Sequence, residues 1–163
     1  MYTYRCIVTK RDTRAYLPRP IEGVVMRRIL QAGRIAGSSK DSQPCRLVVL
    51  RNAQWRAEIA TCGRFAQHLP SAAVGIAICL PPTGSDFDAG RAAQNMMLAA
   101  WNEGITSCPI SMHDQPCVTG KLGLPEGWRV CVVVALGYQD PSVPLGAGRK
   151  RLPLEEYVHE ERW

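Results

Sequence analysis

Residues 72–80, Ala-Ala-Val-Gly-Ile-Ala-Ile-Cys-Leu, form an uninterrupted apolar run that ends at Pro81 and Pro82. A run of this length without a charge predicts a β-strand that is covered on both faces. Residues 87–103 follow, with apolar side chains nearly all round a predicted helix. Because a helix without a broad polar face is buried on more than one side, this helix is expected at the centre of the fold.

Further helices and strands alternate along the chain. Their periodicity or apolar content predicts helices at 21–36, 53–63 and 115–122, and strands at 46–50, 105–110 and 129–137. In the first helix the pattern places six apolar side chains on one face: Ile21, Val24, Val25, Ile29, Ala32 and Ile35. Helices that alternate with buried strands predict an α/β or α+β sandwich. The length of 163 residues fits a single domain over residues 1–163.

Two segments indicate a second copy of the chain. In so short a chain, one side of the helix at 87–103 is available to a partner subunit. The alternative is a helix that is fully central in a monomer. The tail from Leu152 to Trp163 keeps apolar side chains after the last predicted strand. Such a tail has little reason to lie on a monomer's surface, so we expect it to pack on something, such as the other subunit.

Composition narrows the function classes. No apolar run reaches the ~18 residues of a membrane helix, and the N-terminus lacks a signal-peptide core. We therefore expect a cytoplasmic protein with no membrane partner. The net charge of +6 suits a nucleic acid or a phosphorylated small molecule. The cationic runs at 10–14 and 149–151 lack the interleaved aromatic residues of a single-strand binding surface, so we expect no nucleic-acid partner.

Several kinds of catalytic or metal site are not indicated. The seven cysteines are odd in number and contain no CxxC pair, so we expect reduced core thiols rather than a disulfide framework or a zinc site. The dinucleotide fingerprint, the P-loop and the nucleophile elbow are absent. The histidines are far apart, and each is more typical of a surface or hydrogen-bonded core residue. No catalytic residue and no metal ligand is predicted.

Three polar segments stand at the ends of predicted elements. Lys10-Arg11-Asp12-Thr13-Arg14 precedes the first long helix, Ser38-Ser39-Lys40-Asp41-Ser42-Gln43-Pro44 follows it, and Arg149-Lys150-Arg151 comes after the last strand. The hydroxyls, amide and backbone N–H groups of the middle segment suit a polar heterocycle or a ribityl chain. Guanidinium groups from the two ends can close around one phosphate through charge-assisted hydrogen bonds.

In this order, the segments resemble the nitroreductase family of FMN proteins. The matching stretches run over almost the whole chain and are 10–18, 29–33, 38–44, 94–100, 123–127, 135–138 and 149–156. The segment at 38–44 and the end segment are the most telling, and the ordered combination is stronger than any single motif. The resemblance implies an α+β fold with a mixed, mainly antiparallel sheet flanked by helices. It also implies an intertwined homodimer, formed through the central helix, with FMN at the interface.

The resemblance also implies which residues bind the flavin. Lys10, Arg11 and Arg14 of the first segment, which includes Asp12, would face the phosphate and the pyrimidine edge. A cation such as Arg14 near N1 and O2 stabilises reduced flavin and raises its potential. The resemblance places Ser38, Ser39, Asp41 and Gln43 along the ring and ribityl chain, and within this group Ser39 and Gln43 would serve the partner's flavin. It places Pro109, Ile110 and Ser111 over the ring near N5. Arg149 and Arg151 would bind the phosphate.

The chain departs from the family pattern at three positions. Asp41 stands where the family usually has Asn. Cys45 follows the Gln43-Pro44 pair, where the family often has Trp. Asp12 stands where the family's first motif has Ser. A carboxylate at position 41 is unfavourable beside reduced flavin unless it points away or pairs with Lys40. Asp12 also resembles the flavin-destructase branch, whose lid needs a longer chain. The short length further suggests that the helical insertion of larger members is missing, which leaves the flavin face more open.

The implied function is an FMN-dependent NAD(P)H oxidoreductase. NADH or NADPH would deliver hydride to flavin N5, leave, and be replaced by an acceptor such as a nitroaromatic or a quinone, with the cofactor carrying the chemistry. One alternative is a non-catalytic flavin-binding protein for storage or sensing. Another is a specialised flavin enzyme, such as a dehalogenase or a flavin destructase. A basic domain that binds nucleic acid or a protein partner is the last alternative.

Overall fold

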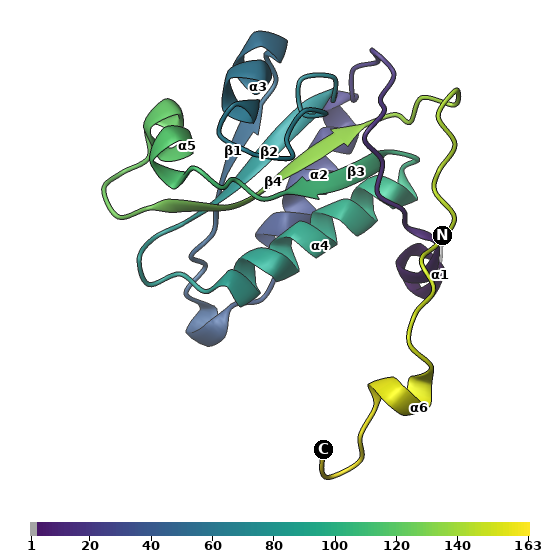
Figure 1. Ribbon diagram of the computed structural model, residues 1–163. Coiled ribbons are helices and arrows are strands. Elements are labelled where there is room, and N and C mark those ends of the chain that lie inside the picture. Colours follow the sequence, from purple (N-terminus) through teal and green to yellow (C-terminus); the bar gives the residue numbers. More distant parts are fainter. Residues whose placement is uncertain (1–2) are drawn as a thin grey trace.

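A four-stranded sheet with helices on both faces forms the body of the computed structural model, which describes residues 3–163 (Figure 1). The strands are β1 (Arg46–Leu50), β2 (Val74–Leu80), β3 (Thr106–Ile110) and β4 (Arg129–Gly137), in the order β1-β2-β4-β3. All three neighbouring pairs are antiparallel. A parallel bridge joins Asp12 to Ser107 of β3. The expected α+β fold with a mainly antiparallel sheet is confirmed.

The helices form two layers. They are α1 (Thr3–Thr9), α2 (Gly23–Arg34), the 3-10 turn η1 (Ser39–Asp41), α3 (Ala53–Ala60), α4 (Asp86–Asn102), α5 (Gln115–Leu122) and α6 (Leu154–Tyr157). Helices α2 and α4 cover one face of the sheet, and α3 and α5 cover the other (Figure 1). The predicted helices and strands are confirmed with ends shifted by up to three residues, whereas α1 and α6 were not predicted.

Strand β2 is the centre of the core. All seven of its residues are buried. Ile76, Ile78 and Leu80 pack with α2 and α4, while Ala77 and Cys79 pack with α3 and α5. Because successive strand residues point to opposite faces, an unbroken apolar run is what a strand between two helical layers requires. The prediction of a strand covered on both faces is confirmed.

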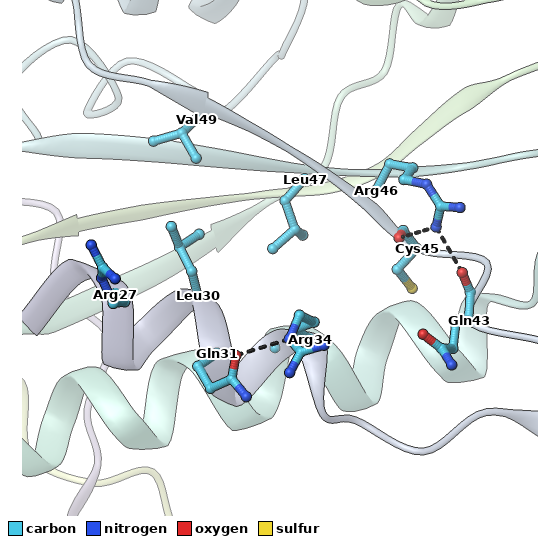
Figure 2. A pocket seen from close by; sticks show the side chains of 10 residues that line it. Arg27, Leu30, Gln31, Arg34, Gln43, Cys45, Arg46, Leu47 and Val49 are labelled. Carbon is cyan, nitrogen blue, oxygen red and sulfur yellow. Dashed lines mark hydrogen bonds between the residues drawn. The ribbon is translucent and has the colours of Figure 1, made fainter. Parts of the chain in front are cut away.

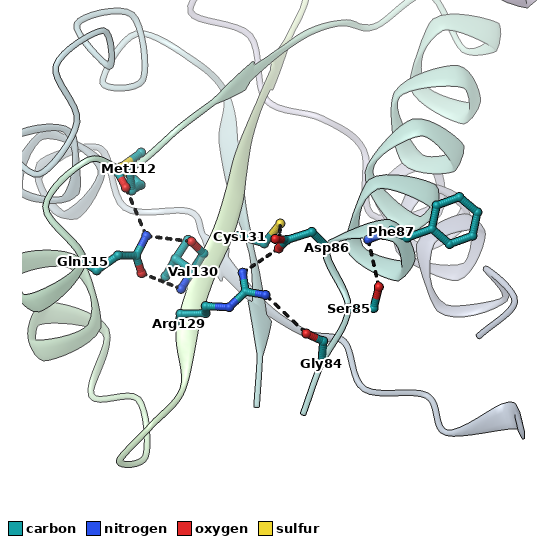
Figure 3. A network of polar contacts seen from close by, with 9 residues as sticks. All are labelled: Gly84, Ser85, Asp86, Phe87, Met112, Gln115, Arg129, Val130 and Cys131. Carbon is teal, nitrogen blue, oxygen red and sulfur yellow. Dashed lines mark hydrogen bonds and ion pairs between the residues drawn. The ribbon is translucent and has the colours of Figure 1, made fainter. Parts of the chain in front are cut away.

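A polar network fixes the start of α4 to the sheet (Figure 3). Asp86 accepts hydrogen bonds from the Arg129 guanidinium at 2.6 Å and from the Cys131 thiol at 3.1 Å. These bonds lower the pKa of the Asp86 carboxyl. Burial, together with the Asp86 bond, raises the pKa of Cys131 to about 11. Ser85 caps the helix by accepting from the Phe87 N–H at 3.2 Å. The bonds to Asp86 therefore hold the N-terminal end of α4 against β4.

Helix α4 is buried on one side only. Its buried residues include Ala89, Ala93, Met96 and Ala100, but Phe87 is 72% exposed. The alternative of a helix that is fully central in a monomer is therefore wrong. Away from the stripe that faces the sheet and α2, Phe87 is exposed, and Leu98, Ala99 and Trp101 are only half-buried in the single chain.

The helix predicted over residues 21–36 is narrower than its pattern indicated. Val24 and Ile35 are 57% and 64% exposed, so their assignment to the buried face is wrong. The helix packs through Met26, Ile29 and Gly33. A Cβ on Gly33 would lie 2.8 Å from the Met96 side chain, and this close approach to α4 determines which side of α2 is buried.

The expectation that the cysteines are reduced is wrong for one pair. Cys62 and Cys117 form a disulfide with a Cα–Cα distance of 5.6 Å. The free thiols are Cys6, Cys45, Cys79, Cys108 and Cys131. The two bonded cysteines are 55 positions apart, and they meet only because α3 and α5 cover the same face of the sheet. Spacing along the chain therefore contained no signal for the pair.

The C-terminal tail leaves the body of the chain (Figure 1). Its large apolar side chains are all exposed: Leu152, Leu154, Tyr157, Val158 and Trp163. Within the single chain, the tail therefore does not bury the side chains that led us to expect packing. A separate finding is that, over residues 3–163, no helix is long and apolar enough to cross a bilayer.

Candidate functional site

The segment before the first long helix is fixed to the edge of the sheet. Asp12 bridges Ser107 of β3, and Tyr16 forms an antiparallel bridge with Gln139. The Tyr16 hydroxyl donates to the Thr13 carbonyl at 2.7 Å inside the core. Burial raises the pKa of the Tyr16 phenol far above its usual value, so the hydroxyl remains a donor. The cations of this segment therefore project from an anchored backbone.

A cleft of about 890 Å³ lies between this segment and the chain after β4; we call it the cationic cleft. Its lining comes from α1, the first polar segment, α4 and the end segment, and comprises Ile7, Val8, Lys10, Arg11, Asp12, Arg14, Gln94, Gly146, Ala147, Gly148, Arg149 and Arg151. Five of these side chains are cations and one is a carboxylate. The structure thus brings together the predicted site residues from the two ends of the chain.

None of the four guanidinium groups of the cationic cleft has a carboxylate partner within residues 3–163. Over residues 3–163, the ion pairs are Lys10–Asp12, Arg28–Glu103 and Arg129–Asp86. Arg11, Arg14, Arg149 and Arg151 are absent from this set. Unpaired guanidinium groups that face one hollow attract an anion with which they can form charge-assisted hydrogen bonds. The donor set of the cleft therefore fits a phosphate.

Arg11 is held differently from the other arginines. Its Nη1 donates to the Val8 carbonyl at 3.0 Å and to the Lys10 carbonyl at 2.9 Å. A Cβ on Gly148 would lie 2.9 Å from the Arg11 guanidinium. Because Gly148 has no side chain, the two ends of the chain can approach closely here. Arg11 thus packs against the end segment at Gly148 and also adds positive charge to the cleft.

A second hollow, of about 560 Å³, borders Arg14; we call it the Arg14 cavity. Its other lining residues, Phe65, Gln67, His68 and Ser71, come from the loop between α3 and β2. Arg14 lines both hollows. A ligand with a phosphate at one end and a polar ring at the other would therefore extend past this arginine.

His68 is the buried titratable group of the Arg14 cavity. It is 8% exposed, and its Nε2 has no hydrogen-bond partner among residues 3–163. Burial, and secondly the charge of Arg14, lower the pKa of this imidazole. His68 is therefore neutral at pH 7. The loop itself is shaped by the Gln67 side-chain amide, which donates to the Arg64 carbonyl at 2.7 Å.

The polar segment at 38–43 has an unusual backbone. Lys40, Asp41 and Gln43 have φ values of 52°, 52° and 46°, a left-handed conformation that is uncommon outside glycine and costs about 1–3 kcal/mol per residue. The Ser38 hydroxyl accepts from the Gln43 N–H at 2.9 Å, and the Gln43 side chain donates to Asp41 at 3.1 Å. Asp41 thus bonds to Gln43, and no Lys40–Asp41 ion pair occurs within residues 3–163.

This segment lies away from the cationic cleft of its own chain. Gly37 contacts Arg91 near the start of α4, whereas Thr9 of α1 accepts a hydrogen bond from Trp101 near its end. Ser38, Ser39, Asp41 and Gln43 are absent from the cleft lining. One chain therefore does not unite all the predicted flavin contacts.

Gln43 instead lines a groove of about 450 Å³ between α2 and β1 (Figure 2). The groove has an apolar floor that includes Leu30, Leu47 and Val49. Its cationic side chains are Arg27, Arg34 and Arg46. Strand β1 pairs only with β2 among the described strands, so this groove runs along an unpaired edge of the sheet.

The predicted contacts near flavin N5 lie at the end of β3. Pro109 and Ser111 are exposed, but the Ile110 side chain is 3% exposed and packs in the core. Since strand side chains alternate, only the backbone of Ile110 can face a ligand on the surface of this strand.

The residues of the 65–71 loop were not predicted as part of the site. Phe65, Gln67, His68 and Ser71 stand in a stretch without a recognisable motif. Their relation to Arg14 depends on how the loop folds back over the sheet. A buried histidine in a polar loop was the only available signal, and that signal is equally typical of a core residue.

Comparisons with known proteins show the family of the chain. The Nitroreductase family model matches residues 7–73 and 81–138. A relative from Archaeoglobus fulgidus whose name includes NAD(P)H nitroreductase is 28% identical over 170 residues, which cover 98% of this chain and 97% of the relative. The structure of NADPH:FMN oxidoreductase from Vibrio harveyi in complex with NAD+ has a TM-score of 0.89 at 27% identity, covering 99% of this chain and 77% of that one.

A third comparison is with nitroreductase A from Vibrio parahaemolyticus, whose structure has a TM-score of 0.90 at 26% identity and covers 100% of this chain and 77% of that one. The fold is shared with these two solved structures. This chain belongs to the Nitroreductase family.

Proposed function

We propose that this chain is an FMN-dependent NAD(P)H oxidoreductase that reduces nitroaromatic, quinone or similar acceptors. The observation that carries the proposal is the position of Arg14 between the cationic cleft and the Arg14 cavity. FMN has a phosphate at one end and a polar ring at the other, and so matches the sequence of donors along the two hollows. Bound FMN would supply the hydride chemistry.

In this proposal the chain's own residues bind the cofactor and orient it. Arg14, Arg149 and Arg151 would hold the phosphate and the near edge of the ring, with Lys10 and Arg11 adding charge at the cleft. Asp12 would hold Lys10 in place through their ion pair. A cation at the pyrimidine edge favours the negative charge of the reduced ring. No protein acid or base is assigned to the reaction, and binding geometry is the protein's contribution.

The complete site requires a homodimer in this proposal. Ser38, Ser39, Asp41 and Gln43 do not line the cleft of their own chain, so Ser39 and Gln43 would serve the partner's flavin. The exposed tail and the open side of α4 supply apolar surface for the contact. The tail also carries four carboxylates, Glu155, Glu156, Glu160 and Glu161. Their charge is opposite to that of the arginines in the groove between α2 and β1 (Figure 2).

Cofactor retention is the first test. The purified protein is mixed with FMN and desalted, and its absorbance spectrum is recorded. We expect a flavin spectrum at about one flavin per chain. Consumption of NADH and of NADPH, with and without a nitroaromatic or quinone, then measures turnover. Consumption of NADH or NADPH that depends on the acceptor supports the proposed enzymatic activity. We place the protein in the cytoplasm, where both donors occur. Bound flavin without turnover would indicate storage or sensing, and a requirement for one substrate would indicate a specialised enzyme.

A further inference from the structure

The disulfide joins the start of the loop that lines the Arg14 cavity to the first turn of α5. Cys62 lies just after α3, and Cys117 lies in the first turn of α5. Cys62 is 2% exposed, whereas Cys117 is half-buried. A small reductant can therefore approach the bond from the α5 side.

Contacts continue from the disulfide along both loops. The Asp114 N–H donates to the Cys62 carbonyl at 3.1 Å. Two residues further on, the Arg64 N–H donates to Nδ1 of His113 at 3.3 Å. Phe65 then packs edge-on against His113, with ring centroids 5.8 Å apart. The loops are thus paired from the disulfide to Phe65, the first residue of the Arg14 cavity lining.

One of the two loops is held independently. The Gln115 side chain donates to the carbonyls of Met112 and Val130 at 3.0 and 2.9 Å, and it accepts from the Val130 N–H at 3.0 Å (Figure 3). Residues 112–115 are therefore tied to β4 whether or not the disulfide is present. The later part of the loop at 62–71 is held by the buried Ala66 and Leu69 and by the Arg56 guanidinium, which donates to the Pro70 carbonyl at 3.3 Å. The start of the loop, residues 62–65, therefore depends most on the bond.

Helix α3 also has a separate contact with α5. Lys121 donates to the Glu58 carbonyl and to the Thr61 hydroxyl, both at 2.8 Å. Opening of the disulfide would therefore leave α3 on α5 and loosen the loop that follows. The change would begin in residues 62–65, which end at Phe65 of the Arg14 cavity.

We propose that the Cys62–Cys117 pair is a redox-sensitive clamp that holds the wall of the Arg14 cavity in its ligand-binding arrangement. With the bond closed, the cavity is preformed; with the bond open, the start of the 62–71 loop, including Phe65, samples other positions and the ligand binds more weakly. The inference rests on the proposed function in that FMN is the ligand whose affinity is expected to change.

The chemistry is a two-electron exchange. A dithiol reductant attacks the S–S bond, and two electrons and two protons are transferred to give two thiols, while the reductant becomes its own disulfide. An oxidant such as oxidised glutathione reverses the step. In a cytoplasmic protein, a disulfide meets thiol reductants and is more often redox-responsive than structural.

The experiment compares the oxidised protein with protein that has been treated with dithiothreitol and desalted under argon. Thiol titration in denaturant should count five thiols per chain before reduction and seven after it. Hydrogen exchange should become faster in peptides that cover 62–71. FMN affinity, measured by quenching of flavin fluorescence, should fall about three- to ten-fold, as expected if a third to a tenth of the reduced molecules keep the competent loop.

Two variants make the result specific. Cys117→Ser should behave as the reduced protein under air, in both exchange and FMN affinity. Cys131→Ser changes a half-buried cysteine outside the pair, and it should retain the difference between the two redox states. If Cys117→Ser does not fold, reduction of the unmodified chain still tests the clamp.

Opposite results would overturn the inference. A count of seven thiols in the air-oxidised protein would show that the bond does not form. Equal exchange at 62–71 and equal FMN affinity in the two redox states would show that the bond does not control the wall. If FMN fails to bind in either state, the proposed function is contradicted, and the exchange of the 62–71 loop alone then decides the clamp.

Discussion

Arg14 is the residue on which the proposed site depends most. It borders both hollows and has no ion-pair partner within residues 3–163. Removing its guanidinium deletes a charge-assisted contact worth about 1.5–3 kcal/mol. We therefore expect Arg14→Ala, and separately Arg151→Ala, to weaken FMN binding by about ten-fold or more, as measured by flavin fluorescence titration. Arg51→Ala, an exposed cation outside both hollows, is the matched control. Unchanged affinity in both site variants would remove these residues from the flavin site.

His68 gives a prediction for pH. Burial lowers its pKa in the folded state, so the unfolded chain binds a proton at a higher pH than the folded chain does. The stability associated with the neutral imidazole is fully present above the usual histidine pKa of about 6.5, and it is lost as the pH falls through the lowered value. We expect the free energy of unfolding to fall between about pH 7 and pH 5, and His68→Gln to reduce that slope.

Urea unfolding over a series of pH values measures this effect. The carboxyls of Asp86 and Asp140 have lowered pKa values, so they titrate below the range in question. His159→Gln, an exposed histidine in the tail, serves as control. A slope that is the same in His68→Gln as in the unmodified chain would show that His68 is not the group responsible.

The sequence identified the cations of the site but not its ring-facing loop. Arg14, Arg149 and Arg151 stand in charged runs whose order along the chain matches a known pattern. Gln67 and His68 lack such a context, because their role depends on the loop's position relative to Arg14. Charge is visible in a sequence, whereas the proximity of uncharged side chains is not.

At the scale of elements, the contact between Tyr16 and β4 positions the first polar segment. A Cβ on Gly137 would lie 2.7 Å from the Tyr16 ring, so a side chain there must displace the segment. We expect Gly137→Ala to destabilise the fold by about 1–3 kcal/mol and to weaken FMN binding. Thermal unfolding and fluorescence titration measure the two effects.

Gly120→Ala is the control for this substitution. Gly120 lies inside α5, and a Cβ there meets nothing within 4 Å. Alanine in an exposed helix is favoured over glycine by up to about 1 kcal/mol, so this variant should be neutral or more stable. Equal effects of the two substitutions would contradict the role assigned to the Tyr16 contact.

Periodicity predicted most of the helices and strands, but it predicted less accurately which of their side chains are buried and which are exposed. The strands were predicted well because two-sided burial requires an unbroken apolar run such as that of β2. Val24 was misassigned because a helix pattern shows which side chains are apolar, whereas the neighbouring element decides which are covered. Helix α1 was not predicted, because residues 3–9 have only Cys6 as a buried side chain.

At the scale of the whole molecule, the tail and the open side of α4 lead to a prediction about assembly. We expect a particle of twice the chain mass of 18.0 kDa in light scattering coupled to size-exclusion chromatography. Deletion of residues 152–163 removes the exposed apolar side chains of the tail while keeping Arg151. Because burial of apolar area stabilises association by about 25 cal/mol per Å², the truncated chain should dissociate at concentrations where the full chain does not.

The same truncation should also weaken FMN binding, since Ser39 and Gln43 of one chain are proposed to serve the other chain's flavin. Arg162→Ala, a single change in the tail that leaves its apolar residues in place, is the control and should remain a dimer. A truncated chain that keeps both its dimer dissociation constant and its FMN affinity would show that the tail is not part of the interface.

The sequence by itself determined the alternation of helices and buried strands, the cationic ends of the chain and the resemblance that identified its class. These properties are local or additive, so periodicity, composition and motif order report them. The tertiary structure decided that Arg14 joins two hollows, that the 38–43 segment lies away from the cleft of its own chain, and that Cys62 bonds to Cys117 across 55 positions. Those properties depend on which distant segments pack on the same face of the sheet, and no pattern within a single segment specifies that.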